Sequence, residues 1–198
     1  LYYNKDGAGW NVYDSVTPSP ITFDTTDLGG DGTYQFYTLA TDNAGNVEDV
    51  PVADFDETTV DTTFPTVDSY TLQVAGEEST TDTNVLISPD GDELKDTADI
   101  DVGFSENGAV SINIKDSEGA VVNSLYSNAD ETDPAAQTWD GTDGESVVAD
   151  GIYTVEVIIT DPAGNSVTDT TKTITVNTVG PVVDVTSPDG SEFLSGGS

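Results

Sequence analysis

Three aspartates alternate along one short polar stretch of the sequence. It reads Ser88-Pro89-Asp90-Gly91-Asp92-Glu93-Leu94-Lys95-Asp96-Thr97, and the carboxylates of Asp90, Asp92 and Asp96 converge if the loop curls. Calcium takes roughly 6–8 oxygen ligands, from carboxylates and from backbone carbonyls such as that of Leu94. Acids this close repel one another unless a cation lies between them. We therefore predict a Ca²⁺ site at Asp90, Asp92, Leu94 and Asp96; the alternative is a turn whose charges face water.

This acidic stretch is not an EF-hand loop. Its sixth position holds Lys95, where that loop requires glycine, and its twelfth holds Asp101 in an expected strand. Calcium would therefore be held by a loop of a different kind.

The residue types that most catalysis requires are missing. The chain has no His and no Cys, so it lacks an imidazole base and a thiol nucleophile. Paired acids can cleave glycosides, but no acid here stands in an apolar setting that would raise its pKa. We therefore expect no enzyme activity and no catalytic residue.

The charge of the chain restricts its partners. There are 38 acidic residues and 4 basic ones, all lysine, which gives a net charge of −34. Such a field repels nucleic acid and anionic membranes and attracts cations. It also opposes compaction unless salt or bound ions offset it. We expect cation binding, no nucleic-acid partner and no direct membrane insertion.

Two copies of one motif pair divide the chain. Asp31-Gly32-Thr33-Tyr34 precedes Asp42-Asn43-Ala44-Gly45-Asn46, and Asp150-Gly151-Ile152-Tyr153 precedes Asp161-Pro162-Ala163-Gly164-Asn165. The offset is 119 residues for both (150 − 31 and 161 − 42), and it falls to 116 where VDTTFP realigns with VNTVGP (176 − 60). Such a repeat indicates an array of domains. We expect the last part of one domain in residues 1–63, a complete domain in 64–179, and the first strands of another, with Val182, Val183 and Val185, in 180–198.

Alternating apolar residues predict strands throughout. Residues 97–105 and 110–114 each place apolar side chains on one face, and Glu106-Asn107-Gly108 between them predicts a hairpin. Further strands are expected at 121–125, 153–159 and 174–176. No segment shows a helical period. Many short strands separated by turns indicate an all-β, antiparallel sandwich.

Each copy of the repeat carries a tyrosine and an Asp-x-Ala-Gly-Asn loop. We expect Tyr34 and Tyr153 to donate to upstream backbone, as in the tyrosine corner of immunoglobulin-like sandwiches. The Asp is expected to bond the backbone two residues on, with Gly45 and Gly164 left-handed. The alternatives are ligand stacking for the tyrosines, and metal binding for the loops through Asp42, Asn46, Asp161 or Asn165.

Two further polar loops are expected. One is Trp139-Asp140-Gly141-Thr142-Asp143-Gly144, and the other contains the acids at 130, 131 and 133. We expect Trp139 to end a strand and pack against the sandwich. The acids around it are expected to be solvated, with a second cation site as the alternative.

The order of these motifs resembles that of a known module. Three motifs follow one another: Ser88-Pro89-Asp90-Gly91-Asp92 through Thr97, then Trp139-Asp140-Gly141, then Asp150-Gly151-Ile152-Tyr153. This order is similar to that of the immunoglobulin-like (Ig-like) module of flagellar hook-capping proteins. That module has roughly S-P-N-G-D-G-x-x-D-T, then W-D-G, then G-x-Y, so Asp90 replaces Asn and Glu93 replaces the second Gly. Residues 1–63, with Asp42 to Glu48 (DNAGNVE), resemble the Ig-like repeats of bacterial surface-layer, adhesin and secreted-enzyme proteins. The resemblance implies tandem Ig-like β-sandwiches.

Together these features predict a non-catalytic spacer segment of a large extracellular cell-surface protein, of surface-layer, adhesin-stalk or sheath type. We expect calcium or high salt to stabilise it and neighbouring Ig-like domains to be its partners. The alternative is an accessory region of a secreted hydrolase that binds polysaccharide. For that role Tyr2, Tyr3, Trp10 and Tyr13 are the candidate aromatics, although packing within their own domain explains them as well.

Overall fold

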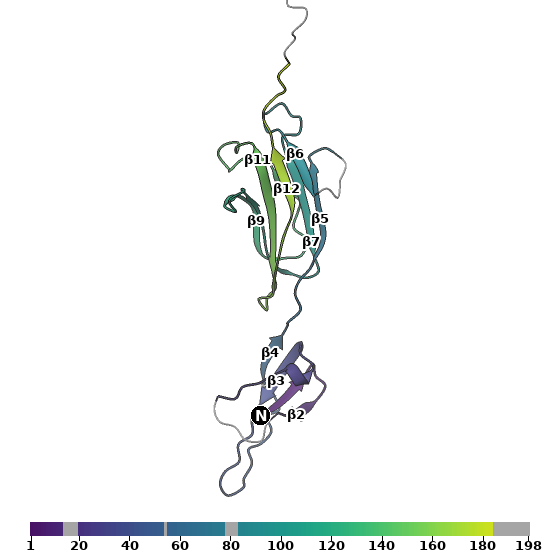
Figure 1. The fold of residues 1–198 in the computed structure, drawn as a ribbon. Helices are drawn as coiled ribbons and strands as arrows, with labels where there is room; N and C mark the ends of the chain where they lie inside the picture. Colours follow the sequence, from purple (N-terminus) through teal and green to yellow (C-terminus); the bar gives the residue numbers. More distant parts are fainter. Residues whose placement is uncertain (14–19, 54, 78–82, 184–198) are drawn as a thin grey trace, which may run out of the picture.

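The computed structural model describes residues 1–13, 20–53, 55–77 and 83–183, which form two β units (Figure 1). The first unit is a four-stranded sheet of β1 (Tyr2–Lys5), β2 (Trp10–Val12), β3 (Gly32–Tyr37) and β4 (Asp56–Val60), in the order β2-β1-β3-β4. In the described residues the one helical element is a 3-10 turn, η1 (Thr26–Leu28). The expected all-β class is confirmed.

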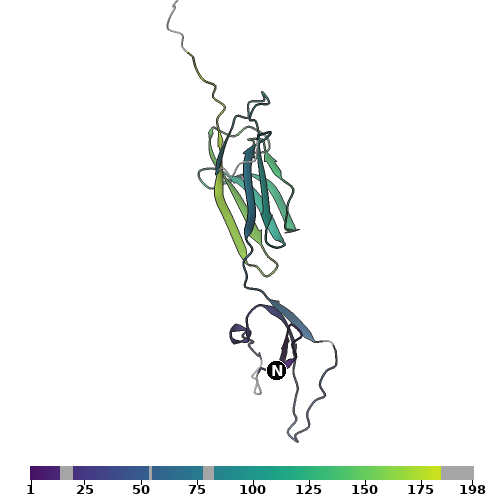
Figure 2. The same ribbon diagram turned by 90° about the vertical axis from the view of Figure 1, so that its right-hand side faces the viewer.

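The second unit is a sandwich of two sheets (Figure 2). One sheet has the order β10-β7-β5, and the other has the order β6-β12-β11-β8-β9. Their bounds are β5 (Val67–Val74), β6 (Asn84–Ile87), β7 (Ala98–Phe104), β8 (Gly108–Lys115), β9 (Val121–Glu131), β10 (Gln137–Trp139), β11 (Gly151–Thr160) and β12 (Ser166–Val176). The pairs are antiparallel except β6 with β12, which is parallel.

The two sheets of the sandwich enclose one apolar core. Alternate residues of the long strands are buried, such as Ile100 and Val102 on β7 and Ile112 and Ile114 on β8. Trp139 ends β10, is fully buried, and donates from Nε1 to the Thr142 carbonyl at 2.8 Å. Its expected packing against the sandwich is confirmed. The free energy of burying these side chains holds the sheets face to face.

The hairpin expected around Glu106-Asn107-Gly108 is wrong. β7 pairs with β5 and β10, whereas β8 pairs with β9 and β11 in the other sheet. Both strands bury one face in the same core, so the chain crosses between the sheets here. Gly108 is needed for space: a Cβ on it would lie 2.6 Å from the Thr160 carbonyl oxygen.

The first unit repeats four strands of the sandwich. Aligning Tyr34 with Tyr153 places β3 on β11 and β4 on β12, and the order β2-β1-β3-β4 then matches β9-β8-β11-β12. Aromatic rings fill this unit in place of aliphatic side chains. Phe23 contacts the rings of Tyr3, Tyr34 and Phe36 at centroid distances of 5.5, 5.4 and 4.7 Å.

Both tyrosine corners are present. The Tyr34 hydroxyl donates to the Gly30 carbonyl at 2.6 Å, and the Tyr153 hydroxyl donates to the Ala149 carbonyl at 2.8 Å. Each bond spans four residues, so the same local geometry recurs in both units. The structural role expected for these tyrosines is confirmed.

The strand expected in residues 180–198 lies mostly outside the described residues. Val182 and Val183 are described, belong to no strand, and are 93% and 80% exposed. The proposal of a further domain there rests on the sequence repeat alone.

Replacing either corner tyrosine with phenylalanine should destabilise its own unit. Tyr34→Phe and Tyr153→Phe each leave a carbonyl without its donor, which should lower the free energy of unfolding by about 1 kcal/mol. Hydrogen exchange read separately over residues 2–60 and 67–176 measures each unit. The control is Tyr2→Phe, which keeps the ring stacked 4.7 Å from Tyr37. Equal loss in all three variants would contradict a specific role for the hydroxyl bonds.

Candidate metal centre and the junction between the two units

The acidic loop curls as its alternating aspartates predicted. Asp90, Asp92 and Asp96 place carboxylate oxygens within 4.8 Å of one another on the exposed loop between β6 and β7. Backbone N–H groups of the loop bond these oxygens: Leu94 N–H donates to Asp92 Oδ1 at 2.8 Å, and Glu93 N–H donates to Asp96 Oδ2 at 3.0 Å. The backbone of the loop thus helps to bring three carboxylates together.

Leu94 contributes to this loop through its backbone. Its side chain is 69% exposed and has no ligand atom, so the carbonyl is the group that would bind a cation. The carboxylates and this carbonyl supply the hard oxygen ligands that calcium prefers. Calcium binding here stays a prediction.

Two residues of the loop adopt left-handed backbone conformations. The φ angles are +67° at Glu93 and +60° at Lys95, in a region where a side chain costs roughly 1–2 kcal/mol. Lys95 forms an ion pair with Glu77 at 3.0 Å between exposed side chains, which contributes little to stability. The loop therefore holds both electrostatic and conformational strain.

The loop packs against the turn after Trp139. Gly141 has a φ of +72°, and a Cβ on it would lie 2.6 Å from Pro89 Cγ. Only glycine satisfies both the backbone angle and this contact. Pro89 and Gly141 therefore link two motifs that are far apart in the sequence.

A six-residue segment, residues 61–66, joins β4 to β5; we call it the junction segment. From the first unit, Asp31 Oδ1 accepts bonds from Thr62 N–H and Oγ1 at 3.0 and 2.7 Å. From the sandwich, Asn165 Nδ2 donates to the carbonyls of Asp61 and Thr63 at 3.1 and 3.2 Å. Hydrogen bonds from both units therefore hold the segment.

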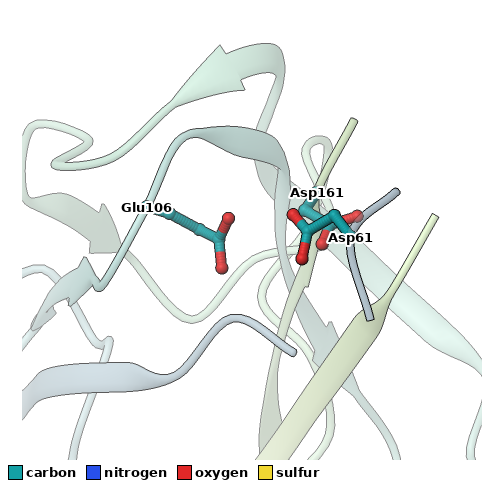
Figure 3. Close-up of side chains that lie close together, drawn as sticks. All are labelled: Asp61, Glu106 and Asp161. Carbon is teal, nitrogen blue, oxygen red and sulfur yellow. The ribbon is translucent and has the colours of Figure 1, made fainter. Parts of the chain in front are cut away.

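A second group of acids lies at this junction (Figure 3). Asp61 of the junction segment, Glu106 of the β7–β8 turn and Asp161 of the β11–β12 turn have oxygens within 4.8 Å of one another. They border a surface cavity of about 470 Å³, which is lined by Thr59, Asp61, Glu106, Asn107, Pro162 and Ala163. Three chain segments thus meet with like charges.

The acidic loop and the turn after Trp139 both lie within a part of the chain that matches a known family. Residues 88–162 match the family model of the FlgD Ig-like domain. The match confirms the resemblance of this part of the chain to the hook-capping module. The comparison with curated proteins finds no match.

Among solved structures, dimeric latent PorU from Porphyromonas gingivalis is similar at 17% identity and a TM-score of 0.38. The similar region covers 74% of this chain and 12% of the PorU chain.

The structure explains two glycine positions of the motifs that residues 88–162 share with the FlgD Ig-like domain. The family pattern has glycine where this chain has Glu93, and that position has a positive φ. The W-D-G glycine is Gly141, which the contact with Pro89 of the S-P motif requires. The motifs thus describe one packed corner of the sandwich.

Glu106 and Asp161, two of the three acids at the junction, have pKa values shifted in opposite directions. Burial, followed by the charges of Asp161 and Asp61, raises the pKa of Glu106. Burial also opposes ionisation of Asp161, but bonds from the Asn165 amide and from backbone N–H groups hold its pKa below its usual value. Asp161 is therefore the stable anion, and Glu106 carries the unfavourable charge.

Both Asp-x-Ala-Gly-Asn loops have the expected left-handed glycine, and Asp42 makes the expected bond to the backbone two residues on. In the other loop Asp161 Oδ1 accepts from the N–H groups three and four residues on. Asp42 Oδ1 accepts from Ala44 N–H at 2.9 Å, Asp161 Oδ1 accepts from Gly164 N–H at 2.7 Å, and φ is +90° at Gly45 and +97° at Gly164. Asp161 accepts three hydrogen bonds, and metal binding by these loops stays an alternative. The junction role of Asp61 and Glu106 was missed, because no local pattern shows which loops meet a linker.

The other candidate residues lie in separate environments. Glu131 accepts a bond from the Tyr126 hydroxyl at 3.0 Å, and Asp143 accepts from the N–H groups of Glu145 and Ser146. The four aromatic candidates for polysaccharide binding do not form one row. Tyr2 and Trp10 pack on Tyr37, and Tyr3 and Tyr13 pack around Phe23.

Substituting glycine at Glu93 should stabilise the sandwich. Glu93→Gly removes the cost of a side chain at positive φ, but glycine also gives the unfolded chain more freedom. The net effect should raise the free energy of unfolding by up to about 1 kcal/mol. Glu93→Gln is the control, since it removes the charge and keeps the backbone cost. Urea unfolding of the three proteins measures the difference. If Glu93→Gly is no more stable than Glu93→Gln, the positive φ at this position does not cost the natural chain stability.

Neutralising Glu106 should stabilise the junction at neutral pH. A pKa raised by folding means that the folded state favours protonated Glu106, so that stabilisation is present below the unfolded pKa and lost as pH rises through the folded value. We expect Glu106→Gln to melt at a higher temperature than the natural chain at pH 7 and at the same temperature near pH 4. Glu118→Gln, in an exposed turn, is the charge-matched control. An equal gain in Glu118→Gln, or a gain independent of pH, would overturn this assignment.

Proposed function

We propose that this chain is a non-catalytic structural spacer of a large extracellular cell-surface protein. The observation that carries the proposal is the junction segment, which both units hold by side-chain hydrogen bonds. A tethered pair of independent domains would need no such bonds. A segment fixed at both ends instead keeps the units in line, which is the property a spacer requires.

The domain division proposed for this role follows the sequence repeat. Residues 1–63 form the last part of one Ig-like domain, 64–179 a complete one, and 180–198 the start of another. Neighbouring Ig-like domains are then the partners. In the described residues no helix is long and apolar enough to span a membrane.

Calcium or high salt is proposed to stabilise the spacer, with Asp90, Asp92, Asp96 and the Leu94 carbonyl as the ligands. The supporting observation is the convergence of three carboxylates, two of them exposed and that of Asp96 partly buried, in a chain of net charge −34. A cation between them would relieve their repulsion.

The alternative, an accessory module of a secreted hydrolase, has less support. Its aromatic candidates pack on other rings: Tyr2 stacks on Tyr37 with an interplanar angle of 7°, and Tyr13 packs on Phe23. Stacking covers one face of the Tyr2 ring, which is then not available to a sugar.

Calcium should raise the melting temperature of the sandwich beyond the effect of ionic strength. An ion bound by the native state alone adds about 2.7 kcal/mol at a hundredfold excess over Kd. We expect a rise with CaCl₂ that chelator reverses, and a smaller rise with NaCl at matched ionic strength because salt screens the acids. The double variant Asp90→Asn, Asp92→Asn should lose the calcium effect and keep the salt effect.

The matched control for this experiment is Asp140→Asn, Asp143→Asn, which removes two carboxylates from another turn. Equal calcium responses in the two double variants would show that calcium acts as a general counterion. No response to calcium or to salt would contradict the proposed stabilisation.

A further inference from the structure

Two loops at equivalent positions in the two units are built alike. In one, Asn46 Nδ2 donates to Asp42 Oδ2 at 2.7 Å; in the other, Asn165 Nδ2 donates to Asp161 Oδ2 at 2.8 Å. The backbone bonds match too: Asp42 N–H to Asn46 O is 2.9 Å, and Asp161 N–H to Asn165 O is 3.0 Å. The carboxylate orients the amide in the same way in both loops.

The Asn165 loop is occupied by the junction segment. Its amide donates to two carbonyls two residues apart, those of Asp61 and Thr63. The loop therefore receives an extended segment that has just left the last strand of the preceding unit.

The Asn46 loop has the same amide, and no segment among the described residues bonds it as the junction segment bonds Asn165. Asn46 is exposed, and within the described residues its amide has no acceptor besides Asp42. The connection between β3 and β4, which contains this loop, lies at the end of the first unit farthest from the sandwich (Figure 1). The β11–β12 turn has the equivalent place in the sandwich, where the junction segment reaches it.

We propose that the loop 42–46 is a docking surface for the exit segment of a preceding Ig-like unit, whose carbonyls accept hydrogen bonds from the Asn46 amide. The inference rests on the proposed spacer function and specifies how successive units are joined. The occupant is an extended segment with two carbonyls in i and i+2 positions, directly after a last strand.

The chain contains a second segment of this kind. Residues 177–181 (NTVGP) align with 61–65 (DTTFP), since 177 − 61 and 181 − 65 are both 116. Asp150 Oδ1 accepts from Thr178 N–H and Oγ1 at 3.0 and 2.9 Å, as Asp31 does from Thr62. Both exit segments thus leave their units under the same constraint.

The charge of the exit segment suits the docking surface. Asp42, Glu48 and Asp49 surround the loop with negative charge. The 177–181 segment carries no charge, so it would approach without the repulsion that Asp61 meets at the occupied junction.

The occupied junction is tested first, in the natural chain. Asn165→Asp keeps the shape of the side chain and replaces the amide donors with a carboxylate that repels the carbonyls of Asp61 and Thr63. We expect residual dipolar couplings to show a fixed orientation of the units in the natural chain and independent motion in Asn165→Asp. Asn43→Asp adds the same charge at an exposed position and should leave the orientation fixed. Unchanged couplings in Asn165→Asp would show that the bonds from Asn165 to the junction segment do not fix the orientation of the units.

The docking surface is then tested in a tandem of two complete copies, with the connection after Pro181 of the first copy shortened in steps. Leu1 precedes β1, and Tyr2 pairs with Tyr37 at the end of β3, so the entry point lies near the loop. A shorter connection raises the effective concentration of the exit segment. We expect exchange of the Asn46 side-chain amide in the second copy to slow by about twofold or more at the shortest connection.

Asn46→Asp in the second copy should free the two copies from each other, and Asn43→Asp should not. Exchange at Asn46 equal to that of the single chain at every length, or equal effects of the two variants, would overturn the inference. That result leaves the proposed function intact if Asn165→Asp still releases the occupied junction. A rigid junction in Asn165→Asp would instead count against both.

Discussion

Carboxylate oxygens that accept backbone N–H groups hold the turns of this protein. Asp42, Asp116 and Asp161 each bond the N–H group of a residue four positions on, at 2.8 to 2.9 Å. Such bonds are charge-assisted and satisfy donors that a turn leaves without a partner. The Asn46 side-chain amide, followed by backbone N–H groups, lowers the pKa of Asp42, and the side-chain hydroxyls of Thr62 and Thr63 lower that of Asp31. Some of the 38 acids of the chain are thus stabilised as anions by hydrogen bonds from its own backbone N–H groups.

Three of the four lysines make specific contacts with the strands and turns of the fold. Lys115 bonds Glu156 at 2.9 Å on the outer side of the five-stranded sheet, with both side chains largely covered. Lys172 lies 5.1 Å from the Tyr70 ring, and Lys5 donates to the Gly29 carbonyl at 2.9 Å near Tyr34. These positions stabilise particular contacts and leave the general repulsion among the acids in place. Cations from solution are the remaining way to offset it.

How much the sequence could predict depends on the range of each interaction. The strands around Ile100, Ile112 and Val155 follow from alternation, and the corners at Tyr34 and Tyr153 follow from a repeat, because both are local patterns. The hairpin predicted at Asn107-Gly108 was wrong, since the same dipeptide occurs both in tight hairpins and where a chain crosses between two sheets. The junction acids were not predictable, because Asp61, Glu106 and Asp161 meet only after the linker docks.

The same carboxylates make the response to acid depend on position. For Asp42 and Asp161, folding lowers the pKa, so their stabilisation is present above the unfolded value near 3.8 and lost as pH falls through the folded value. For Glu106 the shift has the opposite sign, and protonation relieves repulsion at the junction. Mild acid therefore stabilises the junction at a pH above that at which stronger acid weakens the turns. Acid therefore acts with opposite signs at the two places: protonation of Glu106 favours the contact between the units over a pH range in which the carboxylates of Asp42 and Asp161 still bind the N–H groups of their turns.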